Sequence, residues 1–329
     1  MTNPTKKLRT AVVGAGYLGR FHAQKYAAMP DVELVAVVDL DLDRARDVAT
    51  EANTIGGGTE AVSDLSDILG NIDAASVVVP NVHHFDVARP LINAGIHVML
   101  EKPLTNTLAQ ADELIALAAE RNVILQVGHL ERFNPAVSFL FDRVTQPLFI
   151  EAHRLGGFKN RATDVDVVLD LMIHDIDILL TLVKSPVVEI RAAGYRVLTP
   201  NIDIANARLE FASGCVANLT ASRVSLKDMR KIRVFEDGAY LSADCATRDN
   251  VMVACDPDVG FTPDTRPELL NHGPTDNLKE ELLAFVRAVR GQAPVPVTGQ
   301  EGRDALAIAI EINDAIKAAG LKRGLPGLD

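Results

Sequence analysis

The stretch Gly14-Ala15-Gly16-Tyr17-Leu18-Gly19 constrains the fold most, because it sets the pattern G-x-G-x-x-G between an apolar strand and a helical pattern. In this pattern the first glycine permits a tight turn, the second lets the backbone approach a pyrophosphate, and the third allows the helix to pack closely on the strand. The N-terminus of the following helix attracts negative phosphates. The sequence therefore predicts a bound dinucleotide, with Gly14, Gly16, Tyr17, Leu18 and Gly19 as its contacts.

An acidic residue after the next strand predicts which dinucleotide is bound. Asp39 lies 20 residues beyond Gly19 and directly follows the apolar run Leu34–Val38, where its carboxylate can accept hydrogen bonds from the adenosine ribose hydroxyls. A 2′-phosphate beside this carboxylate would cost roughly 4 kcal/mol at about 4 Å and an effective dielectric constant near 20, or close to three decades in affinity. We therefore expect NAD rather than NADP, with Arg44 and Arg46 near enough in sequence to soften the discrimination.

Short apolar runs alternate with helical patterns from residue 9 to about residue 126. The predicted strands are Thr10–Val13, Leu34–Val38, Ala75–Val79, His97–Leu100 and Val123–Val127, and the predicted helices begin at Leu18, Asp43, His84 and Thr107. Strands bounded by turn residues and separated by helices form a parallel sheet that is covered on both faces. Residues 1–126 are therefore predicted to form a doubly wound Rossmann domain that binds NAD.

Beyond Gly128 the pattern changes to one helical segment, several β-rich runs and two closing helices. The helical segment is Val165–Leu182, the β-rich runs are Val187–Tyr195, Ala205–Phe211, Cys215–Ser222 and Lys231–Glu236, and the closing helices are Asp276–Arg290 and Gly302–Ala319. A chain of 329 residues favours two domains, at roughly 100 to 200 residues each. Residues 127–329 are therefore predicted to form a second α/β domain with an open, mainly antiparallel sheet.

Charge and cysteine content exclude several classes of protein. The formal net charge of −11 has the wrong sign for general binding to nucleic acid or to an anionic membrane, so neither partner is expected. No segment approaches the roughly 18 to 20 consecutive apolar residues of a membrane span. Cys215, Cys245 and Cys255 contain no C-x-x-C pair, so neither a disulfide framework nor a structural zinc site is suggested. We expect a cytoplasmic protein with reduced thiols.

Polar residues follow two of the predicted parallel strands. Glu101-Lys102-Pro103 follows His97–Leu100 at the carboxyl edge of the sheet, where the nicotinamide end of the cofactor should lie. Proline after Lys102 favours a cis peptide bond that would hold the lysine in one direction, although an exposed Glu-Lys pair before a helix is the commoner explanation. The turn Pro80–His84 brings further polar groups to this edge, and His84 also suits the first turn of a helix. The predicted cofactor contacts at this edge are Pro80, Asn81, His84, Glu101 and Lys102.

Asp170 and His174 stand four residues apart in the predicted helix and therefore share one face. The carboxylate can fix the imidazole tautomer, and histidine can remove an alcohol proton near neutral pH. Metal binding with Asp175 and Asp177 is the rival role, but no further histidine or cysteine stands at ligand spacing, so no metal site is predicted. A capping or buried histidine is the structural alternative.

Two stretches, residues 128–161 and 222–233, carry more basic than acidic side chains. The basic residues are Arg132, Arg143, Arg154, Lys159 and Arg161 in the first stretch and Arg223, Lys227, Arg230, Lys231 and Arg233 in the second. Such residues in an acidic protein could hold a phosphate-bearing substrate. Solvated strand faces and subunit contacts are the alternative.

Together these features resemble the family of glucose-fructose oxidoreductase, inositol dehydrogenase and rhizopine-catabolism proteins (Gfo/Idh/MocA), over nearly the whole chain. The segments that carry the resemblance are Gly14–Gly19, Pro80-Asn81 with His84, Glu101-Lys102-Pro103, and Asp170 with His174. The resemblance implies that Lys102 and His174 meet the hydroxyl being oxidised, that Asp170 supports His174, and that the nicotinamide takes the hydride. It also implies that the open sheet forms subunit contacts, and hence a homo-oligomer, either a dimer or a tetramer.

Within the family, Gly128–Pro135 and Val167–Asp177 resemble most the bacterial members that oxidise the 3-hydroxyl of UDP-N-acetylglucosamine. Such members make a 3-oxo sugar nucleotide, which an aminotransferase converts to a 2,3-diamino sugar for lipid A. Val165–Leu169 stands where many sugar-oxidising relatives have a Gly-rich stretch, which disfavours free inositol or glucose as the substrate. The predicted substrate contacts are Lys102, Arg132, Asn134, Arg154, Lys159, Arg161 and His174.

Two other functions remain compatible with the sequence. The first is a dehydrogenase of the same family that acts on a free polyol or on another nucleotide sugar. The second is a non-catalytic NAD-binding regulator. The set of Lys102, Asp170 and His174 argues against a regulator, because a protein that only senses NAD has no need of an acid–base pair in its second domain.

Overall fold

The computed structural model describes residues 6–159, 165–255, 258, 260, 262 and 265–322, and its chain divides into two compact units. Unit 1 comprises Met1–Leu130 with Asp276–Arg303, and unit 2 comprises Glu131–Thr275 with Asp304–Asp329. The sequence-based division at residue 126 lies near the first of these boundaries. The return of residues 276–303 to unit 1 was not expected from the sequence.

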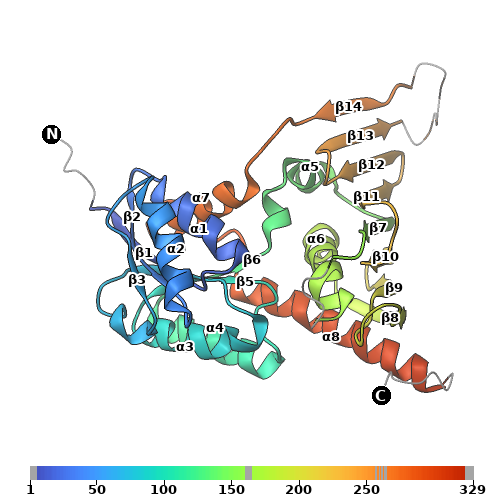
Figure 1. Ribbon diagram of the computed structural model, residues 1–329. Helices are drawn as coiled ribbons and strands as arrows, with labels where there is room; N and C mark the ends of the chain where they lie inside the picture. Colours follow the sequence, from blue (N-terminus) through green and yellow to red (C-terminus); the bar gives the residue numbers. More distant parts are fainter. Residues whose placement is uncertain are drawn as a thin grey trace. The chain divides into compact units, whose positions relative to one another are not determined.

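Unit 1 contains a six-stranded sheet in the order β3-β2-β1-β4-β5-β6, and all of its strand pairs are parallel (Figure 1). The strands are β1 (Leu8–Val13), β2 (Val32–Val38), β3 (Glu60–Val62), β4 (Ala74–Val77), β5 (His97–Glu101) and β6 (Leu125–Gly128). This order confirms the predicted doubly wound Rossmann fold. Only the short strand β3 had no counterpart among the predicted strands.

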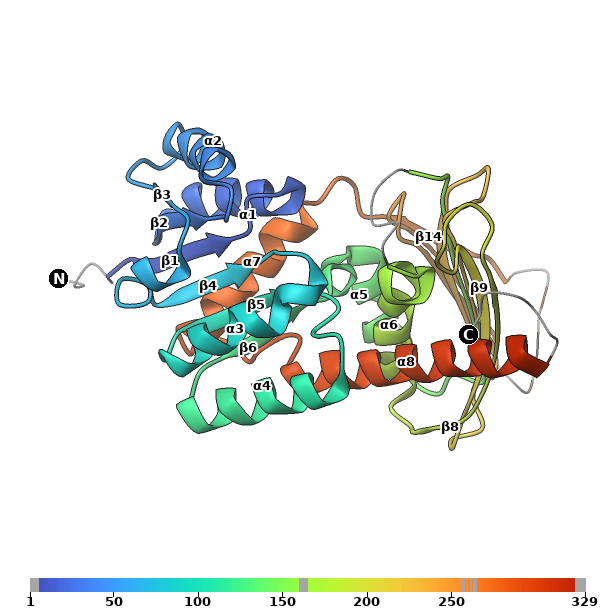
Figure 2. The same cartoon turned by 60° about the horizontal axis from the view of Figure 1, so that its bottom comes forward.

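The helices of unit 1 lie on both faces of this sheet. They are α1 (Tyr17–Ala27), α2 (Leu42–Asn53), α3 (His84–Asn93), α4 (Leu108–Arg121) and α7 (Asn277–Val289), with the short 3₁₀ helices η1 (Leu65–Asp67) and η2 (Asn81–His83). Helices α1, α2 and α7 cover one face, and α3 and α4 cover the other (Figure 2). Side-chain caps begin three of them: Asp41, Thr107 and Asp276 accept from the backbone N–H groups of Arg44, Gln110 and Lys279.

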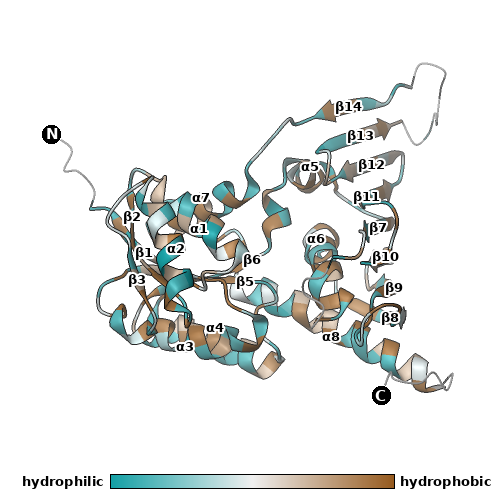
Figure 3. Cartoon of the chain, in the orientation of Figure 1, coloured by the Kyte–Doolittle hydropathy of each residue, from teal (hydrophilic) through white to brown (hydrophobic). Residues whose placement is uncertain are grey.

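Helix α7 belongs to unit 1 because of the apolar face that it presents. Leu282 and Phe285 are fully buried and join the cluster that contains Tyr26 of α1 and Val37 of β2. Burying side chains of this size contributes roughly 1.5 to 3 kcal/mol each. Figure 3 shows the same pattern along the chain, with brown apolar segments in the central strands and teal residues on the outer sides of the helices.

Unit 2 contains an eight-stranded sheet in the order β14-β13-β12-β11-β7-β10-β9-β8. The strands are β7 (Phe149–Leu155), β8 (Val187–Tyr195), β9 (Ile204–Phe211), β10 (Val216–Ser222), β11 (Met229–Glu236), β12 (Ala239–Asp244), β13 (Asp249–Ala254) and β14 (Glu268–Asn271). Six of its seven pairings are antiparallel, and only β7 with β10 is parallel. The prediction of an open, mainly antiparallel sheet is therefore confirmed.

Helices cover one face of the sheet in unit 2 (Figures 1 and 2). They are α5 (Pro135–Arg143), α6 (Ile173–Val183), the π-helical turn η4 (Val168–Met172) that precedes α6, and the C-terminal part of α8 (Gly299–Lys322); the short η3 (Leu130–Phe133) precedes α5. Alternate residues of β7 and β9 are buried beneath them with Ile312 and Ile316 of α8. Among the described residues, no helix has the length and apolar character needed to cross a membrane.

Candidate active site

The glycine-rich loop joins β1 to α1, and its three glycines meet different steric demands. Gly14 has φ +103°, and a Cβ atom there would lie 2.3 Å from the carbonyl oxygen of Val78. A Cβ atom on Gly19 would lie 1.8 Å from the carbonyl oxygen of Gly14, so α1 packs directly on the loop. A Cβ atom on Gly16 would meet nothing within 4 Å, which leaves the backbone there open to a ligand. This arrangement matches the roles expected of the three glycines.

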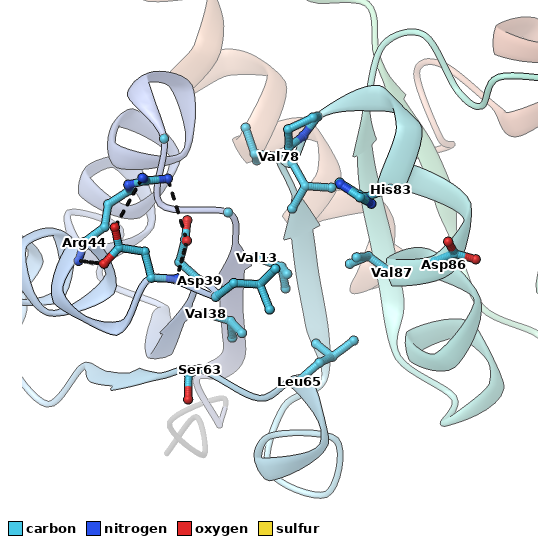
Figure 4. Close-up of a pocket in the computed structure, with 16 residues that line it drawn as sticks. Val13, Val38, Asp39, Arg44, Ser63, Leu65, Val78, His83, Asp86 and Val87 are labelled. Carbon is cyan, nitrogen blue, oxygen red and sulfur yellow. Dashed lines mark hydrogen bonds and ion pairs between the residues drawn. The ribbon is translucent and has the colours of Figure 1, made fainter.

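A cavity of about 560 Å³ lies beside this loop, at the carboxyl ends of β1, β2 and β4 (Figure 4). Its size is within the range of small-molecule and cofactor sites. Its lining residues are Val13, Gly14, Gly16, Val38, Asp39, Leu40, Asp41, Arg44, Ser63, Leu65, Val78, Val79, Pro80, His83, Asp86 and Val87. Valine and leucine side chains form an apolar slot, and charged groups lie at its sides, as in sites that bind a base and a ribose.

Asp39 is fixed at the mouth of this cavity by two backbone groups. Its Oδ2 accepts from the N–H of Ala15 at 2.7 Å, and its Oδ1 accepts from the N–H of Asp41 at 2.9 Å. Each carboxylate oxygen retains a further lone pair for a ribose hydroxyl. Nη1 of Arg44 lies 3.8 Å from Oδ1 of Asp39, and Nη2 lies 3.3 Å from Asp41 (Figure 4).

The residues of this cavity fit NAD. The first turn of α1 has no side-chain cap, so its N–H groups suit a pyrophosphate. Of the predicted cofactor contacts, Gly14, Gly16, Asp39 and Pro80 line the cavity. Tyr17 is 74% exposed, Leu18 is half-buried and Gly19 is buried under the loop.

The second predicted group of cofactor residues lies at the ends of β4 and β5. Glu101 ends β5, and its Oε2 accepts from the backbone N–H of Lys102 at 3.3 Å. The Lys102–Pro103 peptide bond is cis, as the proline predicted. Lys102 itself is half-buried.

His84 and Asn81 join segments of this edge to one another. The imidazole of His84 is buried, with Nδ1 2.8 Å from the carbonyl oxygen of Pro103 and Nε2 3.0 Å from that of Val79. Burial lowers the pKa of His84 below its ordinary value, although the two carbonyl groups oppose this shift. Asn81 donates from Nδ2 to Oδ1 of Asn106 at 2.7 Å. His84 is the first residue of α3, which confirms the prediction that it suits the first turn of a helix. Its two ring nitrogens also connect Pro103 to Val79, just after β4.

In unit 2, Asp170 and His174 lie one turn apart where η4 passes into α6. The sequence predicted a continuous helix here, but a π-helical turn interrupts it, a feature that is frequent at functional sites. Asp166 begins the turn by accepting from the N–H groups of Val168 and Leu169 at 2.9 and 3.0 Å. Its other oxygen accepts from Asn313 of α8 at 3.0 Å, so this turn is anchored at its start.

A second pocket, within unit 2, adjoins Asp170. Its lining residues are Arg154, Leu155, Gly156, Gly157, Lys159, Asp170, Leu171, Arg223, Asp228 and Arg230. Four basic side chains and two acidic ones face it, which favours an anionic group. These basic side chains thus lie beside one member of the predicted acid–base pair.

Two of the predicted substrate-binding arginines are held in buried ion pairs. Arg132 makes a bidentate pair with Asp177, at 2.8 and 2.6 Å. Arg154 lies 2.7 Å from both Asp175 and Glu131. The Arg154 and Asp175 side chains are each 4% exposed, and that of Glu131 is 11% exposed. Burial alone would raise the pKa of Glu131, but Arg154 outweighs it and lowers that pKa. These pairs hold the segment before α5 against α6 and β7.

Asn134 belongs to the same buried polar network as these ion pairs, which is called the buried frame of unit 2 below. It begins α5 by accepting from the N–H of Ala136 at 3.1 Å, and it donates to Glu131 at 3.0 Å and to the carbonyl oxygen of Cys245 at 2.9 Å. Its side chain therefore has three protein partners. Whether it also touches substrate stays a prediction.

Lys159 and Arg230 reach the second pocket more openly than Arg154 and Arg223 do. Lys159 is exposed, and the Arg230 side chain is 50% exposed with Nη1 3.9 Å from Glu131. Arg223 is buried and donates to the carbonyl oxygen of Val165 at 2.6 Å. The sequence analysis placed Arg223 and Arg230 in a basic stretch but did not predict that they line a pocket, because a run of charges does not show which of its side chains face a pocket. Arg161, a predicted contact, lies outside the described residues.

The fold and these sites define a class of protein. Residues 8–129 match an oxidoreductase family with an NAD-binding Rossmann fold, and residues 137–241 match the Gfo/Idh/MocA C-terminal domain. The chain belongs to the Gfo/Idh/MocA family and is an NAD-dependent oxidoreductase, as the resemblance implied.

Particular relatives narrow the comparison. The chain is 38% identical over 315 residues to UDP-N-acetylglucosamine 3-dehydrogenase of Acidithiobacillus ferrooxidans, covering 94% of this chain and 98% of the relative. A solved structure of that dehydrogenase aligns with a TM-score of 0.87 at 37% identity over 95% of this chain and 98% of the other. Myo-inositol 2-dehydrogenase of Thermotoga maritima is 26% identical, covering 91% of this chain and 93% of the relative.

Proposed function

We propose that this enzyme oxidises the 3-hydroxyl of UDP-N-acetylglucosamine to the 3-oxo sugar nucleotide, with NAD as the oxidant. The observation that carries the proposal is the pocket of unit 2, where four basic side chains adjoin Asp170. Positive side chains beside an acid–base pair suit a substrate whose negative charge is close to the reacting sugar. The 38% identity to a UDP-N-acetylglucosamine 3-dehydrogenase supports the same substrate.

The proposed chemistry uses three side chains of this chain. When bound, the nicotinamide supplies the acceptor for the hydride of the carbinol carbon. His174 removes the hydroxyl proton as general base, Asp170 supports the resulting imidazolium, and Lys102 polarises the oxygen and can relay the proton. Loss of one hydride and one proton converts the alcohol to the ketone, and the proton passes from the base to solvent.

The diphosphate of the substrate is proposed to lie against Lys159 and Arg230 in the second pocket. Arg230 and Lys159 are accessible there, and a guanidinium can bind a phosphate in a bidentate manner. For Arg132, Asn134 and Arg154 we propose an indirect part, because their polar groups are engaged in the buried frame of unit 2. Arg161 stays a proposed contact from the sequence.

The wider setting is also a proposal. From the family resemblance we propose that an aminotransferase converts the 3-oxo sugar nucleotide to a 2,3-diamino sugar for lipid A. The cytoplasm is the proposed compartment, because Cys215, Cys245 and Cys255 are free thiols. A homo-oligomer formed through the open sheet of unit 2 is proposed from the family resemblance.

The test is to follow the absorbance of reduced nicotinamide after mixing the purified enzyme with NAD and UDP-N-acetylglucosamine. A ketone trap is included, because oxidation of a secondary alcohol by NAD is unfavourable at equilibrium. We expect a signal with the nucleotide sugar and none with N-acetylglucosamine alone. A signal only with myo-inositol or another free polyol would overturn the substrate assignment, and no signal with any alcohol despite NAD binding would favour a non-catalytic role.

A further inference from the structure

Two buried arginine–carboxylate pairs hold the first two turns of α6, the helix that carries His174. Arg132, in η3, donates from Nε and Nη2 to the two carboxylate oxygens of Asp177 at 2.8 and 2.6 Å. Arg154, on β7, donates from Nε and Nη2 to Asp175, with Nη2 2.7 Å from Oδ1. The side chains of both pairs are at most 10% exposed. The indirect part of these arginines in the proposed reaction follows from where the pairs lie.

The two pairs lie on either side of His174 around the axis of α6. An α-helix turns by about 100° per residue, so Asp175 stands about 100° from His174 in one direction and Asp177 about 60° from it in the other. Asp175 and Asp177 are buried, whereas His174 is half-buried. The rotation of α6 about its axis is therefore fixed from two sides, and with it the direction in which His174 points.

The helical geometry before His174 does not fix this direction by itself. Val168–Met172 forms the π-helical turn η4, whose hydrogen bonds span five residues rather than four. The angle between Asp170 in this turn and His174 in α6 is therefore not that of a continuous α-helix. Asp166 anchors the start of η4, and the two arginine pairs anchor the helix directly after it. Contacts outside the helix thus set how the proposed acid–base pair is arranged.

Stability alone does not account for four buried charges around the start of α6. Burying an ion pair costs desolvation, and well-packed apolar side chains in its place are often equally stable or more so. A bidentate arginine–carboxylate pair adds direction, because its two parallel hydrogen bonds fix the geometry of both groups. An apolar contact has no such direction. The pairs are therefore suited to setting the orientation of the helix.

We propose that Arg132 and Arg154 are positioning residues for His174. Through Asp177 and Asp175 they fix the rotation of α6, and hence the place of the imidazole. The inference deepens the proposed function and rests on it for the catalytic part of His174. Arg132 is the better residue to test, because Arg154 also lines the second pocket.

The test uses two variants that lose the bidentate geometry without leaving a buried charge unpaired. Arg132→Lys keeps a positive charge beside Asp177 but cannot form the two parallel hydrogen bonds. The double variant Arg132→Met with Asp177→Leu removes one charge of each sign and replaces the pair by apolar bulk. Urea unfolding of both should stay cooperative, with midpoints close to that of the wild type. A change at His174 in these variants therefore reports position and not loss of the fold.

The first readout needs no substrate. The histidine rings are labelled with ¹⁵N, and the His174 resonances are assigned by their loss in His174→Asn. We expect these resonances to be displaced in both variants, because α6 is free to rotate once the directional pair is lost. Unchanged resonances in either folded variant would show that the Arg132 pair does not place His174, and would overturn the proposal.

Turnover with NAD and UDP-N-acetylglucosamine is the second readout. Both variants should lower kcat roughly 10- to 100-fold, as expected for a misplaced base, and should leave the KM for the nucleotide sugar within about threefold. A raised KM with an unchanged kcat would instead show that Arg132 contacts the substrate, and would overturn the proposal.

Arg191→Met is the control for both readouts. Arg191 pairs with Glu189 on β8 of the same unit, and its side chain is 73% exposed. Loss of an exposed pair has little effect, so this variant should change neither the His174 resonances nor kcat. If the wild type shows no turnover with this sugar, the proposed function fails, whereas the resonances still decide whether Arg132 places His174.

Discussion

The Oδ2 atom of Asp39 accepts a hydrogen bond from the backbone N–H of Ala15 at 2.7 Å, which ties the end of β2 to the glycine-rich loop after β1. The acid that faces the ribose site thus also holds the loop that faces the pyrophosphate. Charge and geometry at Asp39 are separable, because an asparagine oxygen can still accept from Ala15.

Asp39→Asn should narrow the preference for NAD over NADP by roughly one to two decades, since it removes the charge that opposes a 2′-phosphate. Arg44, 3.8 Å from Asp39, should then favour NADP further. Fluorescence titration of the two cofactors measures the ratio of their dissociation constants. Asp43→Asn, an exposed acid that pairs with Arg46, is the control. An unchanged ratio in Asp39→Asn would remove the ribose role from this residue.

Lys102→Met and His174→Asn should each lower turnover of UDP-N-acetylglucosamine by roughly 10²- to 10⁴-fold, the usual size of a general acid–base contribution. Both should bind NAD within about threefold of the wild type, because neither residue lines the cavity beside the glycine-rich loop. Lys279→Met, on the exposed side of α7, serves as the control. Wild-type turnover in both variants would refute the catalytic assignment.

Arg230 and Arg154 line the same pocket but should respond differently to replacement by methionine. Arg154→Met leaves Asp175 and Glu131 buried without their partner and should cost about 3 to 5 kcal/mol of unfolding free energy, measured with urea. Arg230→Met removes a half-exposed side chain and should cost less than about 1 kcal/mol while raising the KM for the nucleotide sugar about tenfold. Equal effects of the two variants on the free energy of unfolding and on KM would contradict a structural role for Arg154 and a substrate contact for Arg230.

His84 should make the stability of the enzyme depend on pH. Burial lowers its pKa from the ordinary 6.5, so the unfolded chain binds a proton that the native imidazole does not. Stability due to His84 is therefore present above about pH 6.5 and is lost as pH falls toward the lowered pKa. The advantage of the wild type over His84→Gln in thermal unfolding should shrink from about pH 7.5 to about pH 5.5. An advantage that does not vary over this range would show that the imidazole titrates normally.

Local patterns predicted most of unit 1. Residues close in sequence are enough to predict the steric roles of the three glycines, Gly14, Gly16 and Gly19, and the position of Asp39. Each strand of a buried parallel sheet is a short apolar run that can be recognised by itself. The strand Glu60–Val62 was not predicted, because an alternation of apolar residues cannot be recognised over only three residues. The catalytic and substrate roles of side chains stay predictions, since a sequence motif states which groups are present and not what they touch.

The sequence by itself determined the parallel sheet with its NAD site, the mainly antiparallel second sheet and the family, because these rest on short-range alternation and on ordered motifs. Only the tertiary structure decided that residues 276–303 return to unit 1, where Phe285 is buried in one cluster with residues of α1 and β2. It also decided that Arg132 and Arg154 meet Asp177 and Asp175, while Arg230 faces a pocket. The reason is that the partners of a charge depend on groups that are distant in sequence and on the exclusion of water around them.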